Sequence, residues 1–180
     1  MKVAELELPA WAVASPKRRE HIARVTALAL SWADALRIDS AERDAWRDAT
    51  RWHDALRDAD DPTLRRIVPH LPWAATMLHG PAAATLLAED GERRSSVLDA
   101  IFSHTVGNAK WDRTGRMLYM ADFLEPGRKF DRADRAALAE RVVADFDGTF
   151  RAVVKYRLAD RAGTREKMLP ETAALWDSVQ

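Results

Sequence analysis

Four histidines and two aspartates in this sequence have the types and surroundings expected of metal ligands. They are His21, His53, His79 and His104, with Asp54 and Asp122. Neutral imidazoles and ionised carboxylates bind divalent transition-metal ions. The adjacent pair His53-Asp54 suits such a site, because the carboxylate can bridge two ions while the imidazole binds one of them. Four imidazoles and two carboxylates could therefore hold two divalent ions.

A two-metal centre would give this chain hydrolytic chemistry. Two ions about 3.5–4 Å apart can share a hydroxide, lower its pKa toward neutrality and bind a phosphate oxygen. The sequence has no cysteine, which excludes thiolate ligands, a cysteine nucleophile and disulfides. Histidine and carboxylate remain as ligands. The pattern thus predicts a metal-dependent phosphohydrolase.

Each histidine also has a simpler interpretation. A lone histidine on an apolar helix face is usually a hydrogen-bonded core residue, and His70, which has no periodic context, is assigned to a loop. His79 and His104 could contact substrate or orient a ligand instead of binding metal.

Helices must position the first ligands. Ser15-Pro16 is a helix-start signal, and the predicted helix runs to about Leu36. His21 shares its apolar face with Val25, Leu28 and Trp32. A second helix begins at Asp39-Ser40, with His53 on its apolar face and Asp54, about 100° further round, at the edge of that face.

The later ligands lie on further helical segments. The predicted segments are an apolar run from Pro72 to Gly91 containing His79, a helix from Glu92 that ends at His104, a helix over Arg113–Leu124 containing Asp122, and amphipathic helices over Arg132–Leu158 and Glu171–Val179. No alternation typical of strands and no glycine-rich phosphate loop is visible. The fold class is predicted to be all-α.

The length and net charge of the chain limit the number of domains and the classes of partner. The 180 residues fit a single domain over 1–180, with core motifs at 18–130 and C-terminal helices over 131–180. Lys plus Arg and Asp plus Glu are 28 each, so no global field favours nucleic acid or anionic lipid. No segment approaches the roughly 18 apolar residues of a membrane span. Glu5 and Glu7 interrupt a signal-like run, and we predict a cytoplasmic protein.

The ordered histidines and aspartates resemble the HD superfamily of metal-dependent phosphohydrolases. The strings around them narrow the resemblance: Lys17 to His21, Met77 to Pro81, Ala100 to Gly107, and Tyr119 to Arg128, with a late turn at Leu169 to Thr172. Together they resemble the YqeK family, the bacterial symmetrical diadenosine tetraphosphate hydrolases.

This resemblance implies an HD-domain helical bundle with two divalent ions, usually iron, with manganese or another transition metal as alternatives. It implies cleavage of diadenosine tetraphosphate to two ADP by attack of a metal-bridging hydroxide on phosphorus. The expected partner is a dinucleoside polyphosphate, and a homodimer is considered. The chain departs from the family at Trp52, where a smaller aliphatic residue is usual, and at Arg57, where lysine is common.

Cations near the ligand motifs are candidates for binding the substrate's phosphates. Asp54, Arg57 and Arg128 are the candidate catalytic residues. The candidate substrate-binding residues are Arg18, Thr105, Gly107, Lys110, Glu125 and Arg128. Trp111, near Gly107, is considered for stacking on an adenine.

Two rival functions stay open at this stage. The same metal chemistry could act on another nucleotide or phosphoester, because pocket shape and not the metal ligands selects the substrate. A non-catalytic nucleotide-binding regulator with the same fold would be expected to lack a ligand, whereas the ligand set in this sequence is complete.

Overall fold

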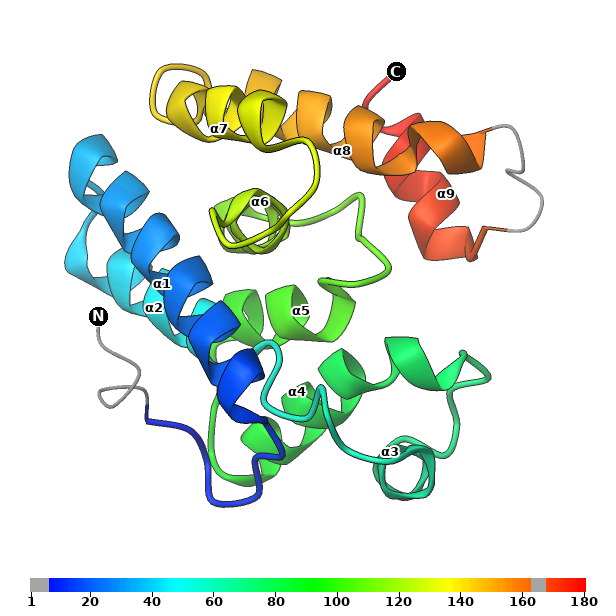
Figure 1. Cartoon of the computed structure of the whole chain (residues 1–180). Coiled ribbons are helices and arrows are strands. Elements are labelled where there is room, and N and C mark those ends of the chain that lie inside the picture. Colours follow the sequence, from blue (N-terminus) through cyan, green and yellow to red (C-terminus); the bar gives the residue numbers. More distant parts are fainter. Residues whose placement is uncertain (1–6, 163–167) are drawn as a thin grey trace.

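The computed structural model describes residues 7–162 and 168–180, with side chains described at 7–159 and 168–180. Within these ranges the chain is helical and contains no strand, which confirms the predicted all-α class (Figure 1). The elements are α1 (Pro16–Leu36), α2 (Ser40–Trp52), α3 (Asp61–Ile67), the 3₁₀ turn η2 (Ala75–Met77), α4 (His79–Glu89), α5 (Ser95–Ser103), α6 (Arg113–Leu124), α7 (Arg132–Arg141), α8 (Phe146–Ala162) and α9 (Pro170–Asp177). Glu5, which was predicted to interrupt a signal-like apolar run, lies outside the described residues.

The ends of α1 and α2 follow from local hydrogen bonding. The Ser15 hydroxyl accepts from the Arg18 amide at 3.3 Å, and the Asp39 carboxylate accepts from the Glu42 amide at 2.9 Å. Both side chains satisfy amides that a helix start leaves without partners. Arg37 ends α1 in the left-handed region with φ 51°. The predicted start and end of α1 are therefore confirmed.

Helix α6 lies at the centre of the described helices (Figure 1). It packs against α1, α2, α5, α7 and α8. A helix surrounded in this way must be apolar on nearly every side, and Arg113–Leu124 is buried from Thr114 onward except at Arg116. One cluster of buried apolar side chains runs through the described helices. Asp122 is therefore carried on the most enclosed helix.

Two of the predicted helices need correction. The helix predicted over Arg132–Leu158 is wrong as one element, because it is divided into α7 and α8. Asp145 accepts a hydrogen bond from the Gly148 amide at 2.9 Å, which is how an aspartate caps the start of a new helix. The helix predicted from Glu92 begins at Ser95, because the Glu92 carboxylate accepts from the amides of Arg93 and Arg94.

Helix α9 packs against the loop that follows α5. The Thr172 hydroxyl donates to the carbonyl oxygen of Val106 at 2.6 Å. Gly107 has φ +91°, and a Cβ there would lie 2.4 Å from Leu175 Cδ2. Helix α9 thus packs directly on the segment after His104.

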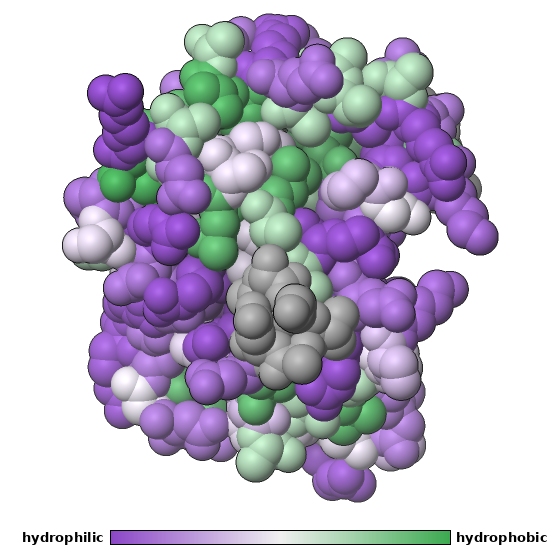
Figure 2. All heavy atoms as spheres, turned by 60° about the vertical axis from the view of Figure 1, so that its left-hand side comes forward, coloured by the Kyte–Doolittle hydropathy of each residue, from purple (hydrophilic) through white to green (hydrophobic). Residues whose placement is uncertain are grey.

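One face of the molecule mixes hydrophilic and hydrophobic side chains. On the face in Figure 2, hydrophilic side chains predominate and hydrophobic ones are interspersed. Among the described residues no helix is long and apolar enough to cross a membrane.

Close packing of α4 on α5 depends on Gly80. A Cβ at this position would lie 2.6 Å from the Ile101 carbonyl oxygen and 3.0 Å from the His104 ring. We expect Gly80→Ala to lower the free energy of unfolding by about 1–3 kcal/mol through overpacking, measured by chemical denaturation. Gly91→Ala separates steric overlap from backbone strain: a Cβ at Gly91 meets no atom within 4 Å, so any loss there comes from its φ of +104° alone, whereas Gly80 has no positive φ. An unchanged denaturation midpoint for Gly80→Ala would contradict this account of the packing.

Candidate metal centre

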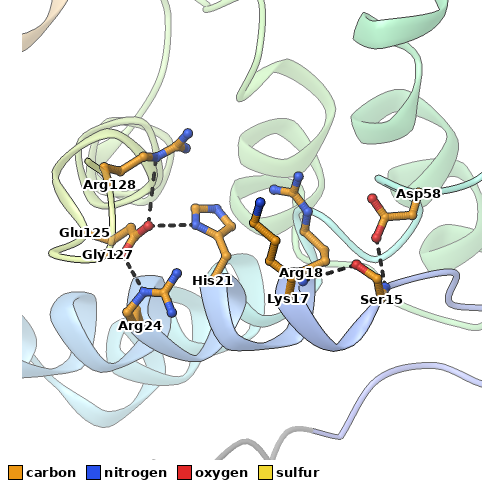
Figure 3. A pocket seen from close by; sticks show the side chains of 9 residues that line it. All are labelled: Ser15, Lys17, Arg18, His21, Arg24, Asp58, Glu125, Gly127 and Arg128. Atoms are coloured by element: carbon orange, nitrogen blue, oxygen red, sulfur yellow. Dashed lines mark hydrogen bonds and ion pairs between the residues drawn. The ribbon is translucent and has the colours of Figure 1, made fainter. Parts of the chain in front are cut away.

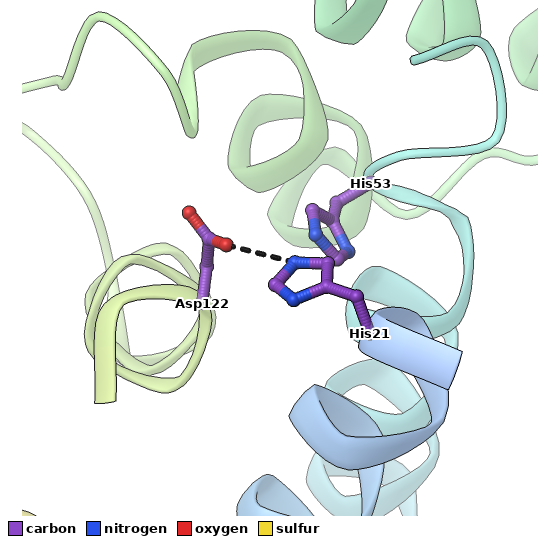
Figure 4. A group of neighbouring side chains, drawn as sticks. All are labelled: His21, His53 and Asp122. Atoms are coloured by element: carbon purple, nitrogen blue, oxygen red, sulfur yellow. Dashed lines mark ion pairs between the residues drawn. The ribbon is translucent and has the colours of Figure 1, made fainter. Parts of the chain in front are cut away.

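The six predicted ligands converge in two neighbouring groups. His21, His53 and Asp122 form one group, and Asp54, His79 and His104 form the other; in each group the potential ligand atoms lie within 4.8 Å of one another. All six side chains are buried. Figure 4 shows the first group, with Asp122 approaching from α6, His21 from α1 and His53 from the end of α2. Residues from separate helices therefore share one interior site.

Asp54 lies between the two groups. Its Oδ2 is 3.5 Å from His53 Nε2 and 3.6 Å from His21 Nε2. Its Oδ1 is 3.2 Å from His79 Nε2 and 3.5 Å from His104 Nε2. Each carboxylate oxygen thus faces a different pair of imidazoles. This is the geometry a bridging carboxylate requires.

Two of the imidazoles are oriented by the helices that end beside them. His53 caps α2 and His104 caps α5. The Nδ1 of each lies 2.7 Å from the carbonyl oxygen three residues earlier, on Thr50 and Ile101 respectively. Carbonyls in the last turn of a helix lack helical partners, so Nδ1–H donates to them. The Nε2 lone pair is then left facing the site, in the form that binds metal.

His21 is oriented by a side chain from another helix. Its Nδ1 lies 3.1 Å from Glu125 Oε1, and Glu125 also accepts from Arg24 Nε at 2.7 Å and from the Gly127 amide at 2.6 Å. A carboxylate on the far ring nitrogen fixes the tautomer of a ligating histidine. Glu125 therefore orients His21 instead of entering the metal site itself.

The unpaired nitrogens in the site fit a bound cation. His21 Nε2 and His53 Nε2 are buried and have no hydrogen-bond partner among the described residues. His21 Nε2 lies 3.1 Å from Asp122 Oδ1, yet outside hydrogen-bond geometry. Buried polar atoms normally have partners, and these atoms point at carboxylates. A divalent ion would satisfy both nitrogens, so the residues present fit the metal that their types predict.

Electrostatics at the centre favour ionised carboxylates. Burial alone would raise the pKa of Asp54, but His53, His104 and His79 outweigh it and hold that pKa well below the usual value. Burial would likewise raise the pKa of Asp122, and His21 with Arg128 keeps it far below the usual value. Both carboxylates therefore stay negative at neutral pH.

The histidines respond to these charges differently. Burial lowers the pKa of His53 to about 4 and also lowers that of His79, so both rings are neutral ligands at pH 7. Burial acts to lower the pKa of His21 as well, but the carboxylates of Asp122 and Glu125 raise it overall. The space around His21 thus attracts positive charge, whether from a proton or from a metal ion.

A cavity of about 170 Å³ opens onto this centre. It is lined by Arg18, Asp54, Arg57, Thr76, His79, His104, Thr105, Asp122, Arg128 and Arg157. A second cavity of about 410 Å³ shares Arg18 and Arg128 with it and extends past His21 and Glu125 toward Lys17 and Asp58 (Figure 3). Cationic side chains therefore surround the approach to the metal ligands on several sides.

Most of the predicted catalytic and substrate-binding residues meet at these cavities. Arg18, Arg57, Thr105, Glu125 and Arg128 line one or both. Gly107 and Lys110 line neither: Gly107 packs against α9, and Lys110 is exposed elsewhere.

The suggested stacking role of Trp111 is wrong. The ring is 3% exposed, packs on Tyr119, and donates from Nε1 to the Asp99 carbonyl oxygen at 3.3 Å. Its faces are not available to a base.

The sequence prediction did not include several of the residues that line the two cavities, among them Arg24, Thr76 and Arg157. Arg24 lies one turn after His21 on α1, and this i+3 spacing could have identified it. Thr76 and Arg157 had no comparable signal, because they come from a 3₁₀ turn and from α8, far from the ligand motifs.

Comparisons with known proteins indicate the family to which this chain is similar. A model of the HD domain matches residues 18–139. A symmetrical bis(5'-nucleosyl)-tetraphosphatase of Staphylococcus aureus is 29% identical over 126 residues, which cover 66% of this chain and 63% of that protein. Proteins with the same name from Bacillus subtilis and Halalkalibacterium halodurans are 27% identical over 122 residues and 21% identical over 154 residues; the matches cover 63% and 81% of this chain and 64% and 81% of those proteins.

The chain therefore spans less than two thirds of the Staphylococcus aureus relative it matches. A solved structure from Clostridium acetobutylicum, described as an HD superfamily hydrolase involved in NAD metabolism, superposes with a TM-score of 0.73 at 21% identity. The superposition covers 92% of this chain and 89% of that one. This likeness supports the helical fold.

The position of Asp54 between both groups predicts how metal content depends on it. We expect Asp54→Asn to lose most of the metal of both groups, and Asp122→Asn to lose that of the His21 and His53 group alone. Elemental analysis of purified protein measures both. Asp99→Asn, at an exposed position on α5, is the matched control and should retain full metal content. Equal, partial losses in the two site variants would contradict a bridging role.

The contact between Glu125 and His21 predicts a smaller effect on metal affinity. Glu125→Ala removes the acceptor that orients the ring, and loss of such a partner weakens metal binding by about 10- to 100-fold. Titration of the metal-free protein with manganese measures the change. An unaltered affinity would mean that His21 is held by packing alone.

Proposed function

The chain belongs to the HD domain family, and we propose that it is a metal-dependent hydrolase that cleaves dinucleoside tetraphosphates symmetrically. The observation that carries this proposal is Asp54, whose two oxygens face separate pairs of imidazoles. A second support is the common name of three relatives, each a symmetrical bis(5'-nucleosyl)-tetraphosphatase.

Two divalent ions fit the groups already described. His21, His53 and Asp122 would hold one ion, His79 and His104 the other, and Asp54 would reach both. When bound, the ions supply an activated water and neutralise charge on a phosphate group. We propose iron as the metal. An all-nitrogen and oxygen ligand set is compatible with iron and also accepts manganese.

The chain's own residues then position a highly charged substrate. Diadenosine tetraphosphate carries about four negative charges, which charge-assisted hydrogen bonds to arginine stabilise. Arg57 lines the cavity near His79, and its side chain makes no hydrogen bond or ion pair within the described residues, so its guanidinium donors are available. Arg128 is committed differently: its Nη2 donates to Asp122 Oδ1 at 2.6 Å. Arg57 therefore binds phosphate, whereas Arg128 holds Asp122 in place.

Arg18 has a comparable positioning role. Its Nη1 donates to Asp54 Oδ2 at 2.6 Å, and the residue lines both cavities. A tetraphosphate bridge crossing the centre would place the two nucleotide halves on either side of Arg18. Water adds to the phosphorus on one side of the central bridging oxygen, the phosphorus–oxygen bond breaks, and each half leaves as ADP.

Two parts of the prediction are also proposals. A homodimer and a cytoplasmic location rest on the family resemblance and on composition. Size-exclusion chromatography with light scattering measures the first directly.

The reaction itself predicts a single nucleotide product. Metal-loaded protein incubated anaerobically with iron and diadenosine tetraphosphate is expected to give ADP alone, resolved by anion-exchange chromatography. Asp54→Asn should lower kcat by about 1,000-fold or more, because both groups of ligands depend on it, while Asp99→Asn should match the unaltered protein. AMP with ATP would contradict symmetrical cleavage. Turnover of NAD or of a simple phosphoester in preference to the tetraphosphate would assign the same metal chemistry to another substrate.

A further inference from the structure

Four arginines line the cavity over the metal ligands, and they fall into two kinds. Arg18 and Arg128 each donate to a ligand carboxylate at 2.6 Å. Arg57 and Arg157 do not donate to either carboxylate within hydrogen-bond distance. The second pair is therefore the source of donors that a bound anion could use.

Arg157 reaches the cavity from α8. Its guanidinium lies 4.0 Å from the centroid of the Tyr119 ring and 5.3 Å from that of Phe123. Its Nη1 donates to the Tyr119 carbonyl oxygen at 3.1 Å. The side chain is 19% exposed, and it lines the cavity with His79, His104 and Asp122. The aromatic rings and one hydrogen bond thus hold the guanidinium at the cavity wall.

A purely structural arginine in this chain is bonded quite differently. Arg135 is 2% exposed, and its guanidinium donates to the carbonyl oxygens of Phe123, Glu125, Arg128 and Phe130. A guanidinium has five N–H donors. Among the described residues, Arg157 directs a hydrogen bond to one carbonyl only, so most of its donors are left for the cavity.

Arg157 is also not needed to hold Asp122. Its Nη1 is 3.9 Å from Asp122 Oδ2, beyond hydrogen-bond distance. Arg128 already donates to both the carboxylate and the carbonyl oxygen of Asp122. Against the effect of burial, the charge of Arg157 helps to hold the pKa of Asp122 below its usual value, but no hydrogen bond commits the guanidinium to that carboxylate, so its remaining donors can bind an anion in the cavity.

We propose that Arg157 is a substrate-binding residue, contributed by α8, that binds a phosphate group in the cavity over the metal centre, beside Asp122. Its planar fork suits phosphate oxygens, and Arg57 faces the same cavity from the segment after α2. The HD match ends at residue 139, before α8 begins. The C-terminal helices would then complete the binding site instead of only covering the core. This assignment rests on the proposed phosphohydrolase function, and its test uses binding as well as turnover.

The test compares Arg157→Gln with Arg151→Gln in the full-length, metal-loaded protein. Arg151 is an exposed arginine on the same helix and serves as the matched control. Isothermal titration measures the Kd for inorganic phosphate and for ADP, and elemental analysis measures the metal. We expect Arg157→Gln to raise both Kd values by a similar factor of about 10- to 100-fold, as loss of a charge-assisted hydrogen bond predicts. Metal content should not change, and Arg151→Gln should bind like the unaltered protein.

Three results of the binding measurements on Arg157→Gln would each overturn the assignment. They are unchanged Kd values in Arg157→Gln, weakened binding of ADP but not of phosphate, and weakened binding that follows an equal loss of metal. If Arg157→Gln does not fold, Arg157→Lys decides in its place, because its stem can still pack on Tyr119. We expect about 3- to 10-fold weaker binding for that variant, since lysine keeps the charge but lacks the fork, and an unchanged Kd overturns the assignment.

Turnover separates this inference from the proposed function. If the unaltered protein does not cleave diadenosine tetraphosphate but phosphate binding still depends on Arg157, the proposed substrate is wrong and the phosphate site stands. If cleavage occurs with the same KM in Arg157→Gln, the function stands and the role of Arg157 is wrong.

Discussion

The burial of two ionised carboxylates at the centre of a helical core is the constraint on which the rest of the structure depends. Asp54 is 3% exposed and Asp122 is 8% exposed. Buried charge is costly unless it is paired or coordinates metal. Four imidazoles surround these carboxylates, and Arg18 and Arg128 contact them from the cavity side. A pair of divalent ions would neutralise the remaining negative charge of the two carboxylates, and the same ions would activate the water needed for hydrolysis.

The geometry of the ligands comes from ordinary features of helix ends. His53 and His104 each follow the last residue of a helix and donate to a carbonyl that the helix leaves without a partner. In both cases the same hydrogen bond gives the carbonyl oxygen a partner and turns Nε2 of the histidine toward the site. His21 lies within α1 and has no free carbonyl nearby, so Glu125 from beyond the end of α6 takes that role. The different partners follow from where each histidine stands on its helix.

The C-terminal helices α8 and α9 contribute contacts to the candidate site as well as packing on the core. Thr172 and Leu175 of α9 fix the segment after His104, which includes the cavity residue Thr105. Helix α8 brings Arg157 to the cavity wall. These contacts link residues outside the HD match to the ligands within it. If Arg157 binds phosphate as proposed, substrate binding would depend on a helix outside the HD match, whereas the candidate metal ligands lie within it.

The sequence by itself indicated the candidate ligand types, their order and the helices near which they lie, but the second helix was predicted to carry His53 and Asp54, and α2 ends before them at Trp52. Helical periodicity placed His21 and His53 on apolar faces, and Ser15 and Asp39 marked the starts of their helices correctly, because these signals act within one or two turns. It did not reveal the division into α7 and α8, where capping by Asp145 competes with a continuous amphipathic pattern. Only the tertiary structure decided that each oxygen of Asp54 faces a different imidazole pair, that Trp111 is enclosed, and that Arg157 reaches the cavity. Each of these depends on contacts between segments distant in the chain, and local periodicity carries no information about such contacts.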